Sequence, residues 1–577
     1  MKKNLNLIIL ILLLVLIVLV GPIKKLVLAG LNSISDGQFS IVTSLNSTAT
    51  GIVENRSIYS SDSPNIIDFY ITVLDKSEDK SEGKYMTFSE MNNISDSVNS
   101  NADPNLQVII QEGNEFGPVK GKYGYGTTSA NGVIELRGQS SRNEHFKSYK
   151  VKLFDNAGLW NGQKVLNFNK HVWDMTRVRN KLSFDLFTLI PNMTSLRTQF
   201  VRLHIKDLSS ANSTNKFVDY GLYTEIEQPN RTFLSSHGLD PNGQLYKVNY
   251  FEFQRTPDTI KNVDDPSFNK KKFEELLEMK AGNDNSKLIQ MLDDLNDYSK
   301  NIDDVVDKYF DRDNYLTWLA TNILFGNFDT DARNYFLYSP SNSLKWYFLP
   351  WDYDGAWARD EQKCYIDENQ RASWMYGVSN YWGVVLHRRF LKDSDNLEQL
   401  NRKIEEISKL INAQTLKKSL DSYYEIIKPQ LAKEPDISSL PMPFKDYDEE
   451  FGRFYEVIEN NKKAYYENIQ KPMPVYMDKL LENGKELKLS WSVSFDFQGD
   501  QIFYDVIVAK DPELKNIVFT KSGLETTEVV LPAMAKGEYY WKVTIRDSSS
   551  NKQIPFDTYF DNFGKHYFGI SKFVIDK

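Results

Sequence analysis

The segment NFDTDARNYFLYSPSNSLKWYFLPWDYDGAWAR, residues 327–359, decides how the rest of the chain is interpreted. Two apolar runs, residues 335–338 and 346–349, enclose the turn-forming letters SPSNS, and this pattern predicts a short β-hairpin. Two carboxylates and one carboxamide lie at the ends of the hairpin: Asp329 and Asn334 before it and Asp352 after it. Because the two ends of a hairpin meet, we expect these side chains to lie close together in space.

The order of these groups is similar to the order in protein kinases. There a catalytic Asp is followed in a D-x-x-x-x-N pattern by a metal-binding Asn, and a metal-binding Asp before Gly comes later. Asp329, Asn334 and Asp352 follow that order, but the usual His-Arg pair does not precede Asp329. The alternative interpretation is that Asp329 and Asn334 only form turns and that Asp352 only caps a loop.

Composition limits the classes of protein that fit. The 577 residues suffice for roughly three or four domains, and a hydrophobic content of 41% excludes a disordered chain. A net charge of −9 argues against a general nucleic-acid binder. The one cysteine, Cys364, excludes an intrachain disulfide and a cysteine-based zinc cluster, and the six histidines show no paired spacing. A bound metal would therefore have oxygen ligands, which favours Mg²⁺ or Mn²⁺.

The N-terminal residues 1–31 predict a signal anchor or transmembrane helix. Two lysines precede an almost wholly aliphatic run over residues 5–20, and Gly21-Pro22 ends the run. We expect this segment to stay in the membrane while the bulk of the chain is exported. A cleaved export signal and a buried core helix are the alternatives. Residues 32–62, which are rich in Ser, Asn, Thr and Gly, predict a spacer.

Strand patterns dominate the next part of the chain. The six glycines of residues 113–132 predict a long hairpin loop, with a phosphate cradle as the alternative. A strand over residues 148–154 places Lys150 and Lys152 on one face, which is either solvated or turned toward a phosphate. A helix is expected over residues 178–187.

Helical periodicity begins after about residue 265. Helices are expected over residues 273–279, 288–295, 302–309, 315–324, 386–391, 397–410, 416–427 and 451–469. The chain is therefore predicted to be α+β, with a sheet-rich lobe followed by a helical lobe, which is the order of lobes in kinases. Residues 471–485 predict a linker. Short strands over residues 486–577 resemble a fibronectin type III β-sandwich that binds a glycan or protein, or acts as a spacer.

Residues 63–470 resemble the CotH family, the spore-coat protein H kinase-like proteins. The resemblance rests on seven short motifs in family order: RGQSS at 137–141, KSYKVK at 147–152, RNKL at 179–182, GLYTEIE at 221–227, LYK at 245–247, NFD at 327–329 with Asn334-Tyr335, and PWDYD at 350–354. The N-terminal apolar segment and the C-terminal sandwich lie outside the resemblance.

The resemblance implies a bilobal atypical protein kinase that binds ATP with Mg²⁺ or Mn²⁺ and phosphorylates Ser or Thr in surface or spore-coat-type proteins. It implies a location at the cell surface or spore envelope. The family's roles map onto matching positions as follows: Asp329 as the catalytic Asp; Asn334, Asp352 and Asp354 as metal ligands; Arg137, Ser140 and Ser141 facing the nucleotide; Lys152, or alternatively Lys150, pairing with phosphate; Glu227 in the nucleotide pocket; and Arg179 in an ion pair near the helix.

Two other functions remain open from the sequence. ATP is scarce outside cells, so the fold can serve a non-catalytic envelope or surface interaction protein. A metal-dependent hydrolase that uses Asp329, Asp352 and Asp354 is the third hypothesis. The expected partners are Ser/Thr-containing protein substrates, the membrane through the N-terminal helix and a ligand of the sandwich, with no nucleic acid.

Overall fold

The structure is a computed structural model that describes residues 52–61, 65–74, 77–78, 85–98, 102–138, 140–210, 214–364, 371–483 and 486–576. The predicted anchor over residues 1–31 and most of the predicted spacer lie outside these ranges. Within the ranges, no helix is both long and apolar enough to cross a membrane. Sheets and helices both occur in quantity, so the predicted α+β class is confirmed.

The first part of the chain forms a β-barrel. Its strands are β1 (Ile67–Val73), β4 (Leu106–Asn114), β6 (Gly132–Arg137), β7 (Ser148–Leu153), β8 (Val165–Asn169), β9 (Thr198–Asp207) and β10 (Val218–Glu227), with β5 (Gly117–Pro118) beside β4. The order is β1-β9-β10-β8-β7-β6-β4, and β4 pairs back onto β1, which closes the sheet. The β1–β9 pair is parallel, and the other pairs are antiparallel.

Alternating side chains fill the barrel and coat its outside. Tyr149 and Val151 of β7 belong to the apolar core inside, whereas Lys150 and Lys152 lie on the outer face. The short helix α2 (Phe88–Asn92) adds Phe88 and Met91 to that core. The hairpin β2–β3 (Ser77–Glu78 and Tyr85–Met86) lies just before this helix in the chain. The outer face of the barrel next to β6 and β8 is the part that matters for the site described below.

A second sheet contains the hairpin predicted from residues 327–359. Its strands run β12 (Leu277–Ala281), β11 (Gln244–Val248), β13 (Tyr335–Ser339) and β14 (Tyr347–Pro350). The β13–β14 hairpin is confirmed. The helix predicted over residues 273–279 is wrong in its second half, because α5 (Lys270–Glu274) ends early and β12 pairs with β11.

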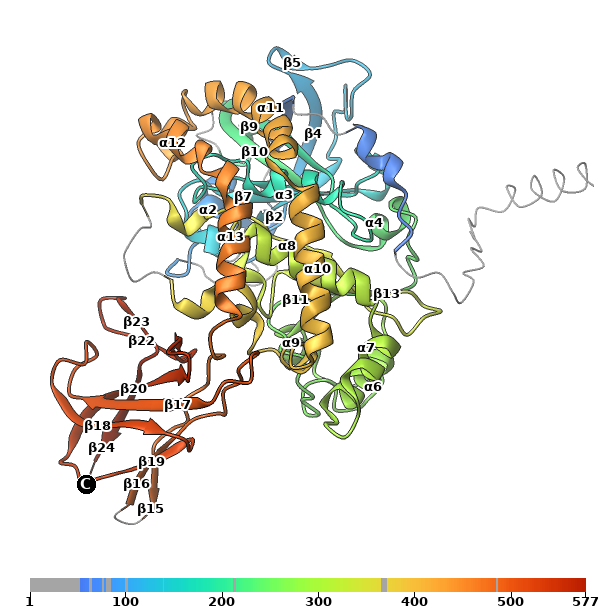
Figure 1. Cartoon of the computed structure of the whole chain (residues 1–577). Coiled ribbons are helices and arrows are strands. Elements are labelled where there is room, and N and C mark those ends of the chain that lie inside the picture. The colour runs from blue at the N-terminus through green and yellow to red at the C-terminus, as the bar shows by residue number, and fades with distance from the viewer. Residues whose placement is uncertain are drawn as a thin grey trace, which may run out of the picture. The chain divides into compact units, whose positions relative to one another are not determined.

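The helices pack partly on this second sheet and partly on the barrel strands β9 and β10 (Figure 1). They are α3 (Arg179–Phe187), α4 (Arg231–Ser236), α6 (Ser286–Asn296), α7 (Ile302–Tyr309), α8 (Arg312–Phe325), α9 (Val385–Leu391), α10 (Ser394–Leu410), α11 (Ala413–Leu431), α12 (Tyr447–Gly452) and α13 (Phe454–Asn468). Helix α8 is buried on every side from Asn314 to Phe325. It packs against α10, α13 and β14, and it is the central element of the largest apolar core.

The last part of the chain is a two-sheet β-sandwich. One sheet holds β15 (Leu481–Asn483), β16 (Glu486–Ser490) and β19 (Glu528–Leu531); the other holds β18 (Ile517–Leu524), β17 (Ile502–Ala509), β20 (Gly537–Asp547), β21 (Lys552–Gln553) and β24 (Ser571–Ile575). A small hairpin, β22 (Thr558–Phe560) and β23 (His566–Phe568), completes it. Trp491 and Trp541 lie in the core between the sheets. That core begins at Val475, ahead of the predicted start of the sandwich at residue 486.

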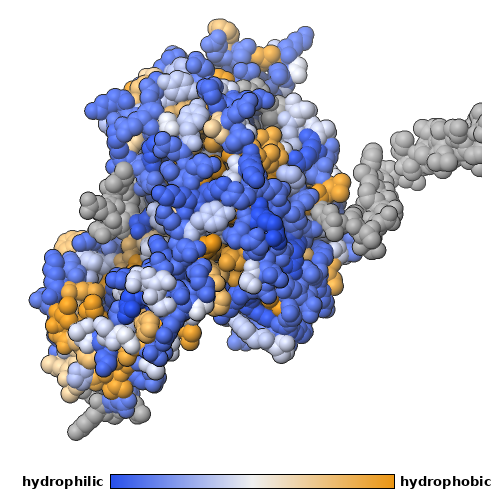
Figure 2. Space-filling model, in the orientation of Figure 1, coloured by the Kyte–Doolittle hydropathy of each residue, from blue (hydrophilic) through white to orange (hydrophobic). Residues whose placement is uncertain are grey.

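The sandwich contacts the helical part through aromatic side chains. Trp382 stacks on Phe495 with ring centres 5.5 Å apart, and Met473 donates its backbone N–H to the carbonyl of Phe495 at 2.8 Å. Polar residues cover most of the face shown in Figure 2, and apolar residues gather on the strands of the sandwich.

Candidate functional site

Helix α8 fixes the position of the β13–β14 hairpin. The side chain of Asn314 accepts the backbone N–H of Phe348 in β14 at 2.7 Å and donates to the carbonyl of the same residue at 3.2 Å. The helix ends at Gly326, whose φ of 65° turns the chain into the short helix η4 (Phe328–Thr330) that contains Asp329. The loop before β13 and the loop after β14 therefore start from one rigid core.

The two loops meet as the sequence predicts. Tyr335 pairs with Pro350 at the end of the hairpin, so Asn334 and Trp351 continue from adjacent strand ends. The Asn334 amide Nδ2 donates to the Asp329 carboxylate at 2.8 Å and to the Asp329 carbonyl at 3.0 Å. A second hydrogen bond joins the two loops: the Asn327 amide of the first loop donates to the carbonyl of Asp352 in the second at 3.3 Å.

Left-handed backbone conformations accumulate at this place. Asn334, Asp352 and His171 have φ values of 59°, 62° and 50°. Asn, Asp and His tolerate this region better than other residues, yet it remains uncommon for them. Such conformations concentrate at functional sites, where the surrounding packing maintains them. The residue types in these two loops are therefore matched to the bends that bring the polar groups together.

Arg137 approaches the loops from the end of β6. Its Nε donates to the Asn169 side chain at 2.6 Å, and its guanidinium lies over the Trp351 ring, 5.2 Å from the ring centre. Burial lowers the pKa of Arg137, while the carboxylates of Asp352 and Asp354 favour its charged form. The barrel thus supplies a cation to the carboxylates of the hairpin.

Asp352 and Asp329 hold their protons more tightly than ordinary carboxylic acids. Burial raises the pKa of Asp352 to about 7, helped by the like charge of Asp354 and opposed by Arg137. Burial also raises the pKa of Asp329 to about 6, against the opposing effect of Arg333, whose guanidinium lies 2.9 Å from the Asp329 carboxylate. Both carboxylates titrate near neutral pH.

Asp354 is the ionised member of the group. Burial opposes its charge, but His171, Arg359 and Arg137 outweigh that effect and lower the pKa of Asp354. The His171 Nδ1 lies 3.9 Å from the Asp354 carboxylate. Asp354 therefore favours its ionised form, helped by the nearby His171, whereas at Asp352 burial and the like charge of Asp354 outweigh Arg137 and Lys247.

The donor set suits a hard divalent cation together with a phosphate. Among the described residues, no hydrogen bond or ion pair engages the Asp352 carboxylate, and the Asn334 amide keeps its oxygen as an acceptor after donating to Asp329. Mg²⁺ is commonly bound by one or two protein oxygens plus phosphate oxygens and water. The carboxylate oxygens of Asp329, Asp352 and Asp354 do not all lie within 4.8 Å of one another. The geometry therefore favours a site in which only Asp352 and Asn334 supply protein ligands to the metal.

Comparison with known proteins connects this site with a family. The model of the CotH kinase protein family matches residues 134–465, more than half of the chain. The chain belongs to the CotH family. A relative, inner spore coat protein H of Bacillus subtilis (strain 168), is 25% identical over 308 residues, which are 52% of this chain and 78% of that protein. The CotH match contains Arg137 and the hairpin loops, and it begins after β1 and β4.

The predicted phosphate-pairing lysines of the CotH domain share one carboxylate. The ammonium groups of Lys150 and Lys152 lie 2.6 and 2.5 Å from Glu135 on the neighbouring strand β6. All three side chains lie on the outer face of the barrel, as does Arg137. Ser141 donates its hydroxyl to the Arg137 carbonyl at 2.8 Å, and Ser140 opens the turn Ser140–Asn143, so this turn supports the end of β6.

Arg179 and Glu227 belong to separate buried ion clusters. Arg179 pairs with Asp174 and, at 2.6 Å, with Glu450, which connects α3 to α12. Glu227 pairs with Arg197 and accepts a hydrogen bond from His237 at 2.9 Å. Neither cluster shares a residue with the acidic site, and the site roles predicted for Arg179 and Glu227 stay predictions.

Three residues near the site were not singled out by the sequence. The Asn180 side chain accepts the backbone N–H of Tyr353 at 2.8 Å, between Asp352 and Asp354. His171 approaches Asp354, as described above. Burial lowers the pKa of Lys247 on β11, while Glu278 and Asp352 favour its charge. Asn180 lies in the motif RNKL and Lys247 in the motif LYK, so these motifs could have indicated both residues. From RNKL, however, the sequence analysis selected Arg179 as the site residue.

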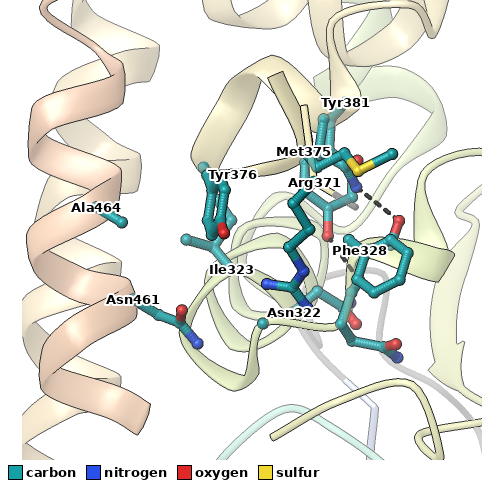
Figure 3. A pocket seen from close by; sticks show the side chains of 13 residues that line it. Asn322, Ile323, Phe328, Arg371, Met375, Tyr376, Tyr381, Asn461 and Ala464 are labelled. Carbon is teal, nitrogen blue, oxygen red and sulfur yellow. Dashed lines mark hydrogen bonds between the residues drawn. The ribbon is translucent and has the colours of Figure 1, made fainter. Parts of the chain in front are cut away.

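A small pocket adjoins the Asp329 loop on the side of the helices (Figure 3). Its volume of about 20 Å³ has room for a water molecule and none for a nucleotide. Arg371 lies over the Phe328 ring at 4.8 Å, and the Asn380 amide donates to the Phe328 carbonyl at 2.8 Å. These contacts support the residue before Asp329 and give the pocket a structural role.

Proposed function

We propose that this CotH chain is an ATP-dependent protein kinase that transfers the γ-phosphate to Ser or Thr hydroxyls of other proteins. The observation that supports the proposal best is the meeting of Asp329, Asn334 and Asp352 at one end of the β13–β14 hairpin, inside the CotH match. In this proposal the barrel is the N-lobe and the helices around α8 form the C-lobe of a bilobal kinase.

The residues divide the chemistry between them. Asp329, with a pKa of about 6, orients the acceptor hydroxyl and takes up its proton. Asp352 and Asn334 hold Mg²⁺ or Mn²⁺, which when bound neutralises phosphate charge. Arg137 and Lys247 supply the cations that face the phosphates. Asp354 keeps the charge of this cluster negative and opposes the ionisation of Asp352 until a cation arrives.

The acceptors that we propose are surface or spore-coat proteins. The support is the name of the relative, inner spore coat protein H. The same name supports a location in the spore envelope. The membrane anchor that we propose, residues 1–31, rests only on the aliphatic run in the sequence. A non-catalytic interaction protein with the CotH fold is the second candidate, because that name describes a coat protein rather than an enzyme.

Transfer of label from [γ-³²P]ATP to a Ser/Thr-rich acceptor, with Mg²⁺ or Mn²⁺, tests the proposal. Asp329→Asn should lower transfer by about 100-fold or more, since it removes the base and keeps the side-chain shape. Asp352→Asn should remove the metal dependence of nucleotide binding. Asp304→Asn, an exposed carboxylate on α7, is the matched control and should act as wild type.

Two outcomes would decide against the kinase. Equal label transfer by wild type and Asp329→Asn would exclude the assigned base. A chain that binds no nucleotide with either metal would favour the interaction protein.

A further inference from the structure

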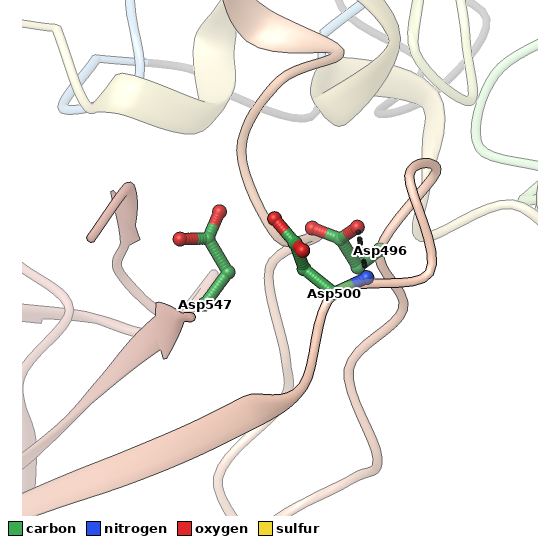
Figure 4. A group of neighbouring side chains, drawn as sticks. All are labelled: Asp496, Asp500 and Asp547. Carbon is green, nitrogen blue, oxygen red and sulfur yellow. Dashed lines mark hydrogen bonds between the residues drawn. The ribbon is translucent and has the colours of Figure 1, made fainter. Parts of the chain in front are cut away.

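Three aspartates of the sandwich meet beside the loop whose Phe495 and Phe497 pack against Trp382 of the CotH domain. Asp496 and Asp500 belong to the loop before β17, and Asp547 is the last residue of β20. One carboxylate oxygen from each residue lies within 4.8 Å of those of the other two. Figure 4 shows the three carboxylates facing the same space. They form the only such group among the residues that the structure describes.

Within the described ranges, no cationic side chain compensates the charge of this cluster. Asp547 is fully buried and Asp496 is only 6% exposed. Hydrogen bonds reach Asp547 from Asn551 and reach Asp500 from the hydroxyls of Ser548 and Ser549. These donors are all neutral, and no Lys, Arg or His within the described ranges forms an ion pair with any of the three. Buried charges are as a rule either paired with an opposite charge or coordinated to a metal ion, and a metal ion would supply the missing charge here.

One oxygen of the cluster has no hydrogen-bond partner among the residues that the structure describes. Asp496 Oδ1 accepts the backbone N–H groups of Gln498 and Asp500 at 2.9 and 3.0 Å. Asp496 Oδ2 is buried and makes no hydrogen bond within the described part of the chain. An unpaired carboxylate oxygen is unfavourable in a buried position, and a cation placed among the three side chains would satisfy it.

We infer that Asp496, Asp500 and Asp547 form a divalent-cation site of the sandwich, with Ca²⁺ as the preferred ion. The spacing limit of 4.8 Å is about twice the Ca–O distance, so one ion can contact all three carboxylates. The three ligands of the cluster are carboxylate oxygens, with neither sulfur nor imidazole among them, which disfavours zinc. This site is separate from the proposed kinase centre and does not depend on it.

A bound ion at this position would also affect the contact between the sandwich and the CotH domain. Phe495 and Phe497, on either side of Asp496, pack against Trp382 of the CotH domain. The Gln498 amide donates to the carbonyl of Ile469 at 3.1 Å, just after α13. A cation that fixes the Asp496 loop therefore also fixes the contact between the sandwich and the helices.

Equilibrium dialysis of the full chain against ⁴⁵Ca²⁺, combined with thermal unfolding, tests the inference. An Asp352→Asn background removes the proposed kinase ligand, so that the remaining binding belongs to the sandwich. We expect one Ca²⁺ per chain and a higher unfolding temperature with Ca²⁺. Asp500→Asn, at a half-buried position, should weaken binding at least tenfold, and Asp496→Asn should do the same.

Asp561→Asn is the matched control. Like Asp496, Asp561 accepts backbone N–H groups from the residues two and four positions later, Phe563 and Lys565, at 2.9 Å each. Among the described residues it belongs to no such carboxylate cluster. It should bind Ca²⁺ as the parent does. The inference fails if the parent binds no Ca²⁺ at millimolar concentration, or if Asp496→Asn and Asp500→Asn bind as well as Asp561→Asn. Because the kinase assay does not enter this test, its result is independent of the proposed function.

Discussion

At the scale of single residues, the charge state of Asp352 controls a measurable part of the stability. Its pKa of about 7 in the folded protein exceeds the usual value of 3.8, so the folded state holds a proton that the unfolded chain releases. The free energy of unfolding therefore falls as the pH rises from about 4 to about 7. Asp352→Asn removes this loss, because the amide does not ionise.

We expect metal-free Asp352→Asn to be more stable than wild type by about 2 kcal/mol at pH 8, with solvent screening allowed for, and by much less at pH 5. Urea unfolding at the two pH values measures the difference. A gain of the same size at both pH values would contradict the assigned cause.

Arg179 gives the second prediction at this scale. It is buried between Asp174 and Glu450. Glu450 also pairs with Arg453 at 2.7 Å, so Arg179→Ala leaves the buried Asp174 without its cation and should destabilise the protein by about 3–5 kcal/mol. Arg402→Ala is the control, because Arg402 forms an exposed pair with Glu398 and should cost less than about 0.5 kcal/mol. Equal unfolding midpoints in urea for the two variants would show that Arg179 is not a structural ion-pair residue.

At the scale of elements, the end of α8 directs Asp329 into the site. Gly326 has a φ of 65°, and a Cβ there would lie 2.6 Å from the Asn461 amide nitrogen. Gly326→Ala should therefore destabilise the protein by about 1–2 kcal/mol and lower phosphate transfer, because the Asp329 loop starts at this residue.

Gly452→Ala on α12 is the control for that change. A Cβ at Gly452 meets nothing within 4 Å, so we expect no loss of stability or activity. Thermal unfolding and label transfer, measured on both variants, check the prediction. It would be wrong if the Gly326 variant matched the Gly452 variant in both measurements.

The elements also show what the sequence can and cannot predict. The β13–β14 hairpin was predictable because alternation and turn letters are local, and so was the closeness of Asp329 and Asn334. The partner of Lys150 and Lys152 was not, because the register that places Glu135 opposite them depends on pairing across strands. The cluster of Asp496, Asp500 and Asp547 was missed for the same reason, since Asp547 ends β20 and meets the loop before β17 only through the pairing of these strands.

At the scale of the whole molecule, the contact between sandwich and helices couples two folded parts. Trp382 packs on Phe495 and Phe497. Trp382→Ala should remove most of this contact, costing about 3–5 kcal/mol of packing. We expect calorimetry to show the sandwich unfolding at a different temperature from the CotH domain in this variant.

Phe563→Ala provides the comparison, because Phe563 is 97% exposed on the sandwich and should leave the calorimetric trace unchanged. If both variants and the wild type gave the same trace, the aromatic contact would not transmit stability between the parts.

The closure of the barrel by β1 also determines how the chain folds in time. Strand β4 follows β1 closely in the chain, but the other partner of β1 is β9, about 130 residues further along. Until β9 emerges from the ribosome, β1 has one unpaired edge that is rich in apolar residues. Contacts of such long sequence separation slow folding. We therefore expect the nascent chain to expose a strand edge that favours aggregation while β6, β7 and β8 are synthesised, and chaperone binding to residues 67–73 would protect that edge.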